Sequence, residues 1–370
     1  MSAQPIPVSI PAVTQRASVR VAGRIDRRIA ILALAALLFA VALFAVAVGA
    51  FPISVSQVIA ILFAQIGVDN GTLFEPQQAA VLLSIRLPRV LLGLVAGGAL
   101  AIAGAALQGL FRNPLADPSL IGVSGGAAVA VAAVIVLGAT VLKGLSQSLG
   151  SFTLPLAGFV GGMIATFLVH ALARHEGRTS LITMLLGGIA VNAVAFAMIG
   201  LFSLIANDEQ LRNITFWSFG SLGGATWQML AALCAPLLVA YAVLARMAPG
   251  LNALAMGERE AAHIGYEVQR LKTGIIILTA LCTGCIVATC GLIGFVALVA
   301  PHIARMLCGP DNRTVVPISA LLGATLMVSA DVIARIVIAP AELPIGVVTA
   351  LLGAPFFLFL LIKQRRHWMT

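Results

Sequence analysis

Residues 86–127 read RLPRVLLGLVAGGALAIAGAALQGLFRNPLADPSLIGVSGGA, and they combine two features that an ordinary soluble helix does not need. The first part is an apolar run of about 20 residues, which is the length that a helix needs to cross a membrane. It leads without a break into a polar turn that contains Pro114 and Pro118, and glycines then open a second apolar run. The stretch therefore predicts two membrane helices joined by a short, structured turn.

The composition of the whole chain is that of an integral membrane protein. Its 370 residues are 61% apolar and 9% charged with a mean hydropathy of +1.08, whereas roughly a quarter of the residues in a soluble domain are charged. We expect an all-α polytopic membrane protein with about ten transmembrane helices, because a membrane barrel would show alternating strands of ~10 residues. The expected spans are 29–50, 87–111, 120–142, 154–173, 181–205, 228–247, 271–290, 293–308, 316–338 and 345–362.

The first apolar run, 29–50, follows several arginines, as the core of a signal peptide would. It is longer than the apolar core of a cleavable signal, which has about 7–15 residues. We therefore expect a retained first span, with residues 1–28 as a cytoplasmic tail and residues 29–370 as one transmembrane domain.

The distribution of lysine and arginine predicts the orientation, because positively charged loops stay in the cytoplasm. If the N-terminus lies inside, all but five of the 22 lysines and arginines fall on the inner side. This asymmetry predicts an even number of spans with both termini cytoplasmic. It also accounts for the net charge of +9 without nucleic-acid binding. The five exceptions are Arg86, Arg89, Lys143, Arg212 and Arg335.

Three of these outer arginines form the clearest electrostatic pattern. Arg86 and Arg89 are three residues apart, so they share one helix face, and Arg335 lies near the outer end of another expected helix. Such a group can grip carboxylates of an external partner or substrate. The alternatives are contact with lipid phosphates, or pairing of Arg335 with Asp331 one turn earlier.

The chain offers little chemistry for an enzyme or a metal site. Cys282 and Cys285 form a C-x-x-C inside an apolar run without a second pair, so we expect them to pack as small apolar residues. His302 is expected to be a hydrogen-bonded packing residue rather than a metal ligand. An intramembrane enzyme would need a nucleophile and base or a metal motif such as H-E-x-x-H, and the sequence has neither. We expect no catalytic residue, metal or cofactor in this chain.

Two polar segments on the inner side are candidate working parts. The turn within 110–126, with Asn113-Pro114 and Asp117-Pro118, is either a tight joint between helices or a turn that follows the substrate pathway. The segment 249–270 predicts two short helices joined by Gly257 and ended by Gly265, lying across the membrane face. It is either a surface that a partner protein grips or a solvated loop.

These stretches resemble the permease subunits of bacterial ABC importers for heme, ferric siderophores and cobalamin, the FecCD or BtuC-like family. The resemblance covers nearly all of the chain after about residue 30 and is carried by residues 86–128, 215–224, 257–265, 291–305 and 330–357. It implies a type II ABC importer bundle with two inverted repeats, roughly 86–205 and 271–362, in a homodimer in the bacterial inner membrane. Its implied partners are two ABC ATPase subunits, a periplasmic substrate-binding protein and membrane lipid.

The resemblance also implies roles for particular residues. Gly257, Glu258, Ala261 and Gly265 would couple the permease to the ATPase, while Arg86, Arg89 and Arg335 would dock the binding protein. ATP and Mg would be bound by the partner subunit, since the chain lacks a G-x-x-x-x-G-K-[ST] motif. Asn192 and Met198, in the span 181–205, are candidates for the substrate pathway.

The implied function is ATP-driven import by alternating access. The stretch FRNPLADPSLIGVSGGAA looks closest to the heme-importing branch, with ferric siderophores and cobalamin as alternative cargoes. An ion-coupled secondary transporter is a remote alternative, because it needs membrane carboxylates and Asp331 is the only acidic residue deep in an expected span.

Overall fold

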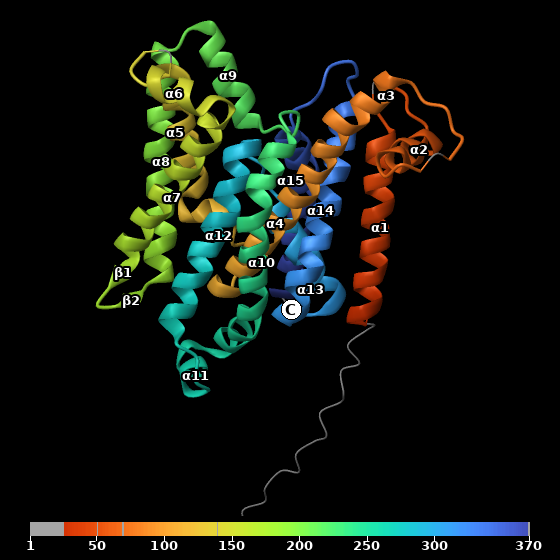
Figure 1. Ribbon diagram of the computed structural model, residues 1–370. Coiled ribbons are helices and arrows are strands. Elements are labelled where there is room, and N and C mark those ends of the chain that lie inside the picture. Colours follow the sequence, from red (N-terminus) through yellow and green to blue (C-terminus); the bar gives the residue numbers. More distant parts are fainter. Residues whose placement is uncertain (1–25, 50, 69, 139, 369–370) are drawn as a thin grey trace, which may run out of the picture.

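The computed structural model describes residues 26–49, 51–68, 70–138 and 140–368, so the expected N-terminal tail lies outside them except for its last three residues. The described chain is almost entirely helical (Figure 1). Its elements are α1 (Arg27–Ala47), α2 (Val55–Gln65), α3 (Pro76–Val81), η1 (Leu82–Arg86), α4 (Leu87–Phe111), η2 (Pro118–Ile121), α5 (Val123–Leu137), α6 (Lys143–Leu149), η3 (Gly150–Phe152), α7 (Thr153–Ala173), β1 (Arg174–His175), β2 (Arg178–Thr179), α8 (Leu181–Ile205), α9 (Asp208–Phe219), α10 (Trp227–Met256), α11 (Glu258–His263), α12 (Val268–Cys290), α13 (Val296–Cys308), α14 (Asn312–Ile336) and α15 (Ile345–Trp368).

The ten predicted spans all correspond to helices, which confirms the all-α membrane fold. Among the described residues, seven helices are long and apolar enough to cross a membrane, and α5, α13 and the apolar part of α15 are shorter. Figure 1 shows the start of α1 and the end of α15 at the same end of the bundle as α11 and the β1–β2 hairpin, and we call this end the inner side. The helices α3, α6 and α9 lie at the opposite, outer side.

The bundle is built around α4, which is buried along nearly its whole length. Two of its glycines face the backbones of α13 and α14: a methyl group at Gly97 would collide with the carbonyl oxygen of Gly323, and one at Gly104 with that of Ala297. Gly126 of α5 and Gly161 of α7 meet in the same way. Lipid tails provide no hydrophobic force between helices, so such close backbone contact is what holds membrane helices together.

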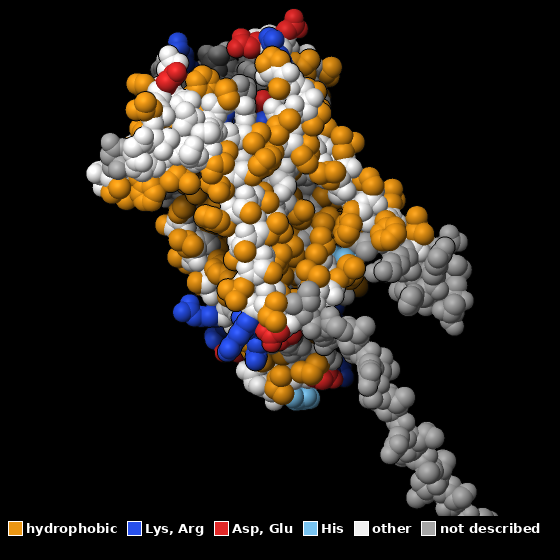
Figure 2. All heavy atoms as spheres, turned by 90° about the vertical axis from the view of Figure 1, so that its right-hand side faces the viewer, with side chains coloured by type: hydrophobic (Ala, Val, Ile, Leu, Met, Phe, Trp, Pro, Cys, Tyr) orange, Lys and Arg blue, Asp and Glu red, His pale blue; other side chains and the backbone are white. Residues whose placement is uncertain are grey.

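The outer surface of the bundle is apolar. Figure 2 shows hydrophobic side chains covering the middle of one face, with lysine, arginine, aspartate and glutamate gathered towards its two ends. Most of α8 is exposed, including Leu186, Phe196 and Leu201. This helix therefore presents an apolar side to lipid or to another protein chain.

The sequence reasoning missed the short helices α2 and α9, although both carry a starting signal. Helix α2 begins with a capping box between Ser54 and Gln57, and α9 begins with one between Asn207 and Gln210. Both helices lie in segments too short or too polar to be recognised as spans. A search for capping residues could have found them.

One prediction about the inner side was wrong. Residues 249–256 do not form a separate short helix, because α10 continues through Pro249 to Met256. Ala248, Leu251 and Leu254 are buried in the core, and this packing sustains the helix through the proline. Only the second short helix, α11, is separate, and Gly257 marks the break.

The role of α4 can be tested with a pair of glycine substitutions. Gly104→Ala should lower the free energy of unfolding by about 1–3 kcal/mol, because the added methyl group has no room against Ala297. Gly200→Ala in α8 is the matched control, since nothing lies within 4 Å of the added methyl group. It should be neutral or stabilising, because alanine has the higher helix propensity. Thermal unfolding in detergent would measure both, and equal losses would contradict this packing account.

Candidate transport pathway

A half-open cavity of about 550 Å³ lies between α4, η2, α5, α8, α12, α13 and α15, and we call it the central cavity. Most of its lining is apolar and includes the aromatic rings of Phe196, Phe295 and Phe357. The polar residues of the lining are Asp117, Ser119, Ser124 and Thr283. The cavity can therefore hold a large apolar molecule that also carries a few polar groups.

The turn after α4 forms part of the cavity wall, and its shape is fixed by side chains. Asp117 accepts a hydrogen bond from the backbone nitrogen of Ser119 at 2.8 Å, which caps η2. Asn192 Nδ2 donates to the carbonyl oxygen of Ser119 at 2.9 Å. Gly188 lets α8 approach closely, because a methyl group there would collide with the Leu120 carbonyl. Asn192 thus holds the wall in place from α8.

The structure places the two candidate pathway residues differently. Asn192 acts on the cavity through Ser119, and it does not line the cavity itself. Met198 is 42% exposed and does not line the central cavity. Phe196 is the α8 residue that lines the cavity, and sequence reasoning missed it because α8 is apolar on every face.

At the outer side, two arginines cap the end of α1. Arg86 donates to the carbonyl oxygens of Val46 at 3.0 Å and Ala47 at 2.8 Å, and also to that of Phe51. Arg335 donates to the carbonyl oxygens of Val48 at 2.9 Å and Ala45 at 3.0 Å. The last carbonyl groups of a helix have no partner within the helix, so the two guanidinium groups supply one.

The third arginine completes a buried charge cluster. Arg89 Nε lies 2.9 Å from Asp331 Oδ1, and Arg335 Nε lies 3.0 Å from Asp331 Oδ2, so the expected pairing of Arg335 with Asp331 is confirmed. Arg89 Nη1 also lies 2.9 Å from Glu342 Oε1. We call Arg86, Arg89, Asp331, Arg335 and Glu342 the outer charge cluster.

At the inner side, α11 is fastened to two neighbouring elements. Glu258 Oε1 lies 2.6 Å from Lys272 Nζ, and the same ammonium donates to the carbonyl oxygen of Thr179 in β2 at 3.1 Å. Gln269 Oε1 accepts from the backbone nitrogen of Thr179 at 2.9 Å. Since β2 leads into α8, these contacts join α11 to the start of α12 and to a helix that lines the cavity.

The predicted coupling residues lie together around α11. Ala261 is fully buried, and it anchors α11 on the bundle. Gly257 and Gly265 have backbone φ angles of +140° and +94°, which glycine adopts without strain, so the chain can turn sharply before and after the helix. Met256 and Ile264 are 64% and 57% exposed and leave apolar surface uncovered beside the helix.

The comparison with known proteins now gives the family. The model of the FecCD transport family matches residues 36–363, which is most of the chain. The chain belongs to the FecCD transport family. It is similar to the hemin transport system permease protein HmuU of Yersinia pestis, with 42% identity over 77% of this chain and 84% of that protein. It is also similar to the cobalamin import system permease protein BtuC of Halobacterium salinarum, with 41% identity over 77% of this chain and 74% of that protein.

A solved structure agrees with the family assignment. A metal-chelate type ABC transporter in an inward-facing conformation shares 31% sequence identity, and the fold matches with a TM-score of 0.77 over 90% of this chain and 98% of that one. The chain is therefore a membrane-embedded, multi-pass permease subunit of an ABC importer of the bacterial inner membrane. FecCD permeases have no ATPase site of their own and work with separate ATPase subunits and a substrate-binding protein.

In this FecCD permease the three outer arginines come together, as their pattern predicted, but they are buried. Arg86, Arg89 and Arg335 are only 5%, 8% and 8% exposed, and each donates hydrogen bonds to other groups of the chain. The side chain of Glu342 is 47% exposed and is the most accessible charge of the outer charge cluster. Docking of a binding protein on these arginines stays a prediction.

An inner polar network also links this permease's coupling segment to the cavity. Arg305 donates to Gln108 Oε1 at 2.7 Å and to Asn312 Oδ1 at 3.3 Å, and Asn312 Nδ2 donates to Asn252 Oδ1 at 2.9 Å. Gln108 Nε2 donates to the carbonyl oxygen of Leu298, which lines the cavity, at 3.2 Å. Sequence reasoning missed this network, because its members come from α4, α10, α13 and α14.

The cysteines and His302 carry no metal site among the described residues. Cys282 and Cys285 are free and buried, which confirms that they pack in the core. No group of three or more histidine, cysteine, aspartate or glutamate side chains within the described ranges could hold a metal ion.

The outer charge cluster leads to a stability prediction. Asp331→Asn should lower the free energy of unfolding by about 3–5 kcal/mol, because it leaves Arg89 and Arg335 buried without their shared carboxylate. Glu342→Gln is the control, and it should cost less than about 1 kcal/mol because that carboxylate is half exposed. Thermal unfolding of both variants would measure this, and a loss in E342Q equal to that in D331N would disprove the central place of Asp331.

Proposed function

We propose that this permease moves heme, or a related iron chelate, from the periplasm to the cytoplasm by ATP-driven alternating access. The observation that carries the proposal is the central cavity, in which three phenylalanines and a few polar groups share one space of about 550 Å³. Heme has a flat apolar ring system and a polar edge, and this lining suits both parts. The similarity to a hemin permease supports the same cargo.

Cobalamin is the alternative cargo, because the chain is also similar to a cobalamin permease. The similarity to a cobalamin permease is almost as high, at 41% identity over an equal share of the chain. Ferric siderophores remain a further alternative within the same family. The aromatic lining favours heme, with its flat macrocycle, over these two alternative cargoes.

The outer charge cluster argues against an ion-coupled secondary transporter. A coupling carboxylate must exchange its ion or proton during each cycle. Asp331 is instead paired with two buried arginines, so it is committed to the structure of the outer end. In this proposal, import is therefore driven by ATP, which the partner ATPase subunits bind together with Mg.

The exposed helix α8 supports assembly with a second copy of this chain. Phe196 of α8 lines the cavity while much of the same helix is uncovered, so a partner along α8 would close the pathway between two copies. The proposed importer is a homodimer with two ATPase subunits on the inner side and a periplasmic binding protein on the outer side. Both termini would then be cytoplasmic, as the distribution of lysine and arginine predicts.

The contacts of α11 support a coupling mechanism. An ATPase subunit that grips Gly257, Glu258, Ala261 and Gly265 would move Lys272 and Thr179 with them, because Glu258 and Lys272 are paired and Lys272 holds β2. That movement would reach α8 and the cavity wall and switch the opening of the pathway. On the outer side, the binding protein would dock at the outer charge cluster, with Glu342 as the first charge it meets.

A charge substitution tests the coupling contact. Glu258→Gln should lower the amount of cargo moved per ATP at least threefold while the complex still assembles, because Lys272 loses its carboxylate partner. Glu267→Gln is the control, since its partner Arg270 is exposed and lies only three residues further along the chain. Transport and ATP hydrolysis measured on the same proteoliposomes give the ratio. If E258Q and E267Q moved equal amounts of cargo per ATP, coupling through Glu258 and Lys272 would be contradicted.

The cargo is tested by reconstituting the permease with its ATPase subunits and binding protein. We expect ATP-dependent uptake of hemin into proteoliposomes, at a rate at least tenfold above that of cyanocobalamin and of a ferric siderophore. Uptake of cyanocobalamin without hemin would replace the proposed cargo. Uptake driven by an ion gradient without ATP would overturn the proposed mechanism.

A further inference from the structure

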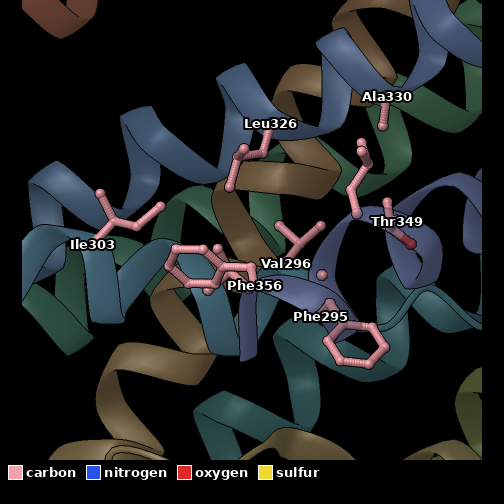
Figure 3. Close-up of a pocket in the computed structure, with 10 residues that line it drawn as sticks. Phe295, Val296, Ile303, Leu326, Ala330, Thr349 and Phe356 are labelled. Carbon is pink, nitrogen blue, oxygen red and sulfur yellow. The ribbon is translucent and has the colours of Figure 1, made fainter. Parts of the chain in front are cut away.

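Phe295 stands between two cavities. One is the central cavity, and the other is an apolar groove of about 190 Å³ between α13, α14 and α15. Figure 3 shows Phe295, Val296 and Phe356 on one side of this groove and Leu326 and Ala330 of α14 on the other. Among the described residues, Phe295 is the one that lines both spaces.

The backbone at Phe295 is strained. Its φ and ψ angles are +66° and −30°, a region that bulky side chains rarely adopt. The residue is held there by packing: a methyl group at Gly353 of α15 would collide with Phe295 Cβ, so the phenylalanine lies directly on the glycine. A strained bulky residue persists only where the surroundings over-determine it, and such residues cluster at functional sites.

The loop that carries Phe295, residues 291–295, is fixed by backbone contacts at three glycines. Gly291 lies against the Trp217 carbonyl of α9, while Gly220 and Gly346 both lie against the Leu292 carbonyl. Two hydrogen bonds close this junction: Ser221 N donates to the Cys290 carbonyl at 2.7 Å, and Ile345 N donates to the Gly220 carbonyl at 3.1 Å. The loop is thus clamped between the outer helix α9 and the start of α15.

We propose that Phe295 is a positioning residue that forms the wall between the central cavity and the apolar groove. Its ring keeps cargo in the central cavity and prevents it from passing sideways between α13 and α15 towards lipid. The role of the ring in transport rests on the proposed function, because an iron chelate with an apolar face would partition readily into an unguarded apolar groove. The packing on Gly353 that maintains the strain also keeps the ring in this place, and without the ring the two spaces would join.

The wall can be tested without any cargo by placing a cysteine behind it. Thr349 lines the groove, is 6% exposed and does not line the central cavity. In proteoliposomes of the permease with its ATPase subunits, a membrane-impermeant maleimide should label Thr349→Cys at least tenfold faster when Phe295→Ala is also present. The same variants without the new cysteine give the background from the five native cysteines.

Three further variants make the result specific. Leu352→Ala removes a side chain that lines only the groove and is 57% exposed, so labelling should stay within twofold of the parent. Phe295→Leu keeps much of the bulk and should restore slow labelling to within threefold. Gly353→Ala should speed labelling at least threefold, because it displaces the Phe295 ring from the opposite side and covers the case in which F295A folds poorly.

Transport gives the second readout. F295A should assemble with its partners, and the hemin moved per ATP should fall at least fivefold. The wall would be overturned if T349C were labelled no faster with F295A than without it. It would also be overturned if L352A sped the labelling of T349C as much as F295A does. Faster labelling in F295A together with no hemin uptake by the unmodified complex supports the wall and rejects the proposed cargo.

Discussion

Contact between the backbone of α4 and the backbones of α13 and α14 is the constraint on which the rest of the structure depends. Gly97 and Gly104 leave no room for a side chain there, so the three helices sit in one register. That register brings Arg89 to Asp331 at the outer end and Gln108 to Arg305 at the inner end. The apolar middle is thus bounded at both ends by polar groups that pair only when the helices are in place.

The same packing creates the pathway. Because α13 is pressed against α4 and is too short to fill the bundle, the loop before it and the turn after α4 leave the central cavity between them. The wall around it is held from outside: Asn192 fixes Ser119, and a glycine junction fixes the loop that carries Phe295. Movement at α11 or at α9 can therefore reach the cavity through few, short connections.

The ten spans were predictable from the sequence because each apolar run is close to the length of a membrane helix. The sequence did not predict which side chains of a helix point into the cavity. Helix α8 is apolar on every face, so no periodicity distinguishes Phe196, which lines the cavity, from Met198, which does not. The grouping of Arg86 and Arg89 was visible in their spacing, but their partners were not. Arg86 binds the free carbonyl groups of α1, about 40 residues earlier, and Arg89 binds Asp331 on α14. The backbone of Phe295 depends on glycines in other helices, which no local pattern reveals.

The most direct test of the account is an electron cryo-microscopy map of the complete complex with hemin and the binding protein. The account predicts hemin density in the central cavity, in contact with Phe196 and Phe295 and near Ser124, while the groove behind Phe295 stays free of hemin. Hemin density outside this cavity, or a cavity closed by side chains in every state of the cycle, would contradict it.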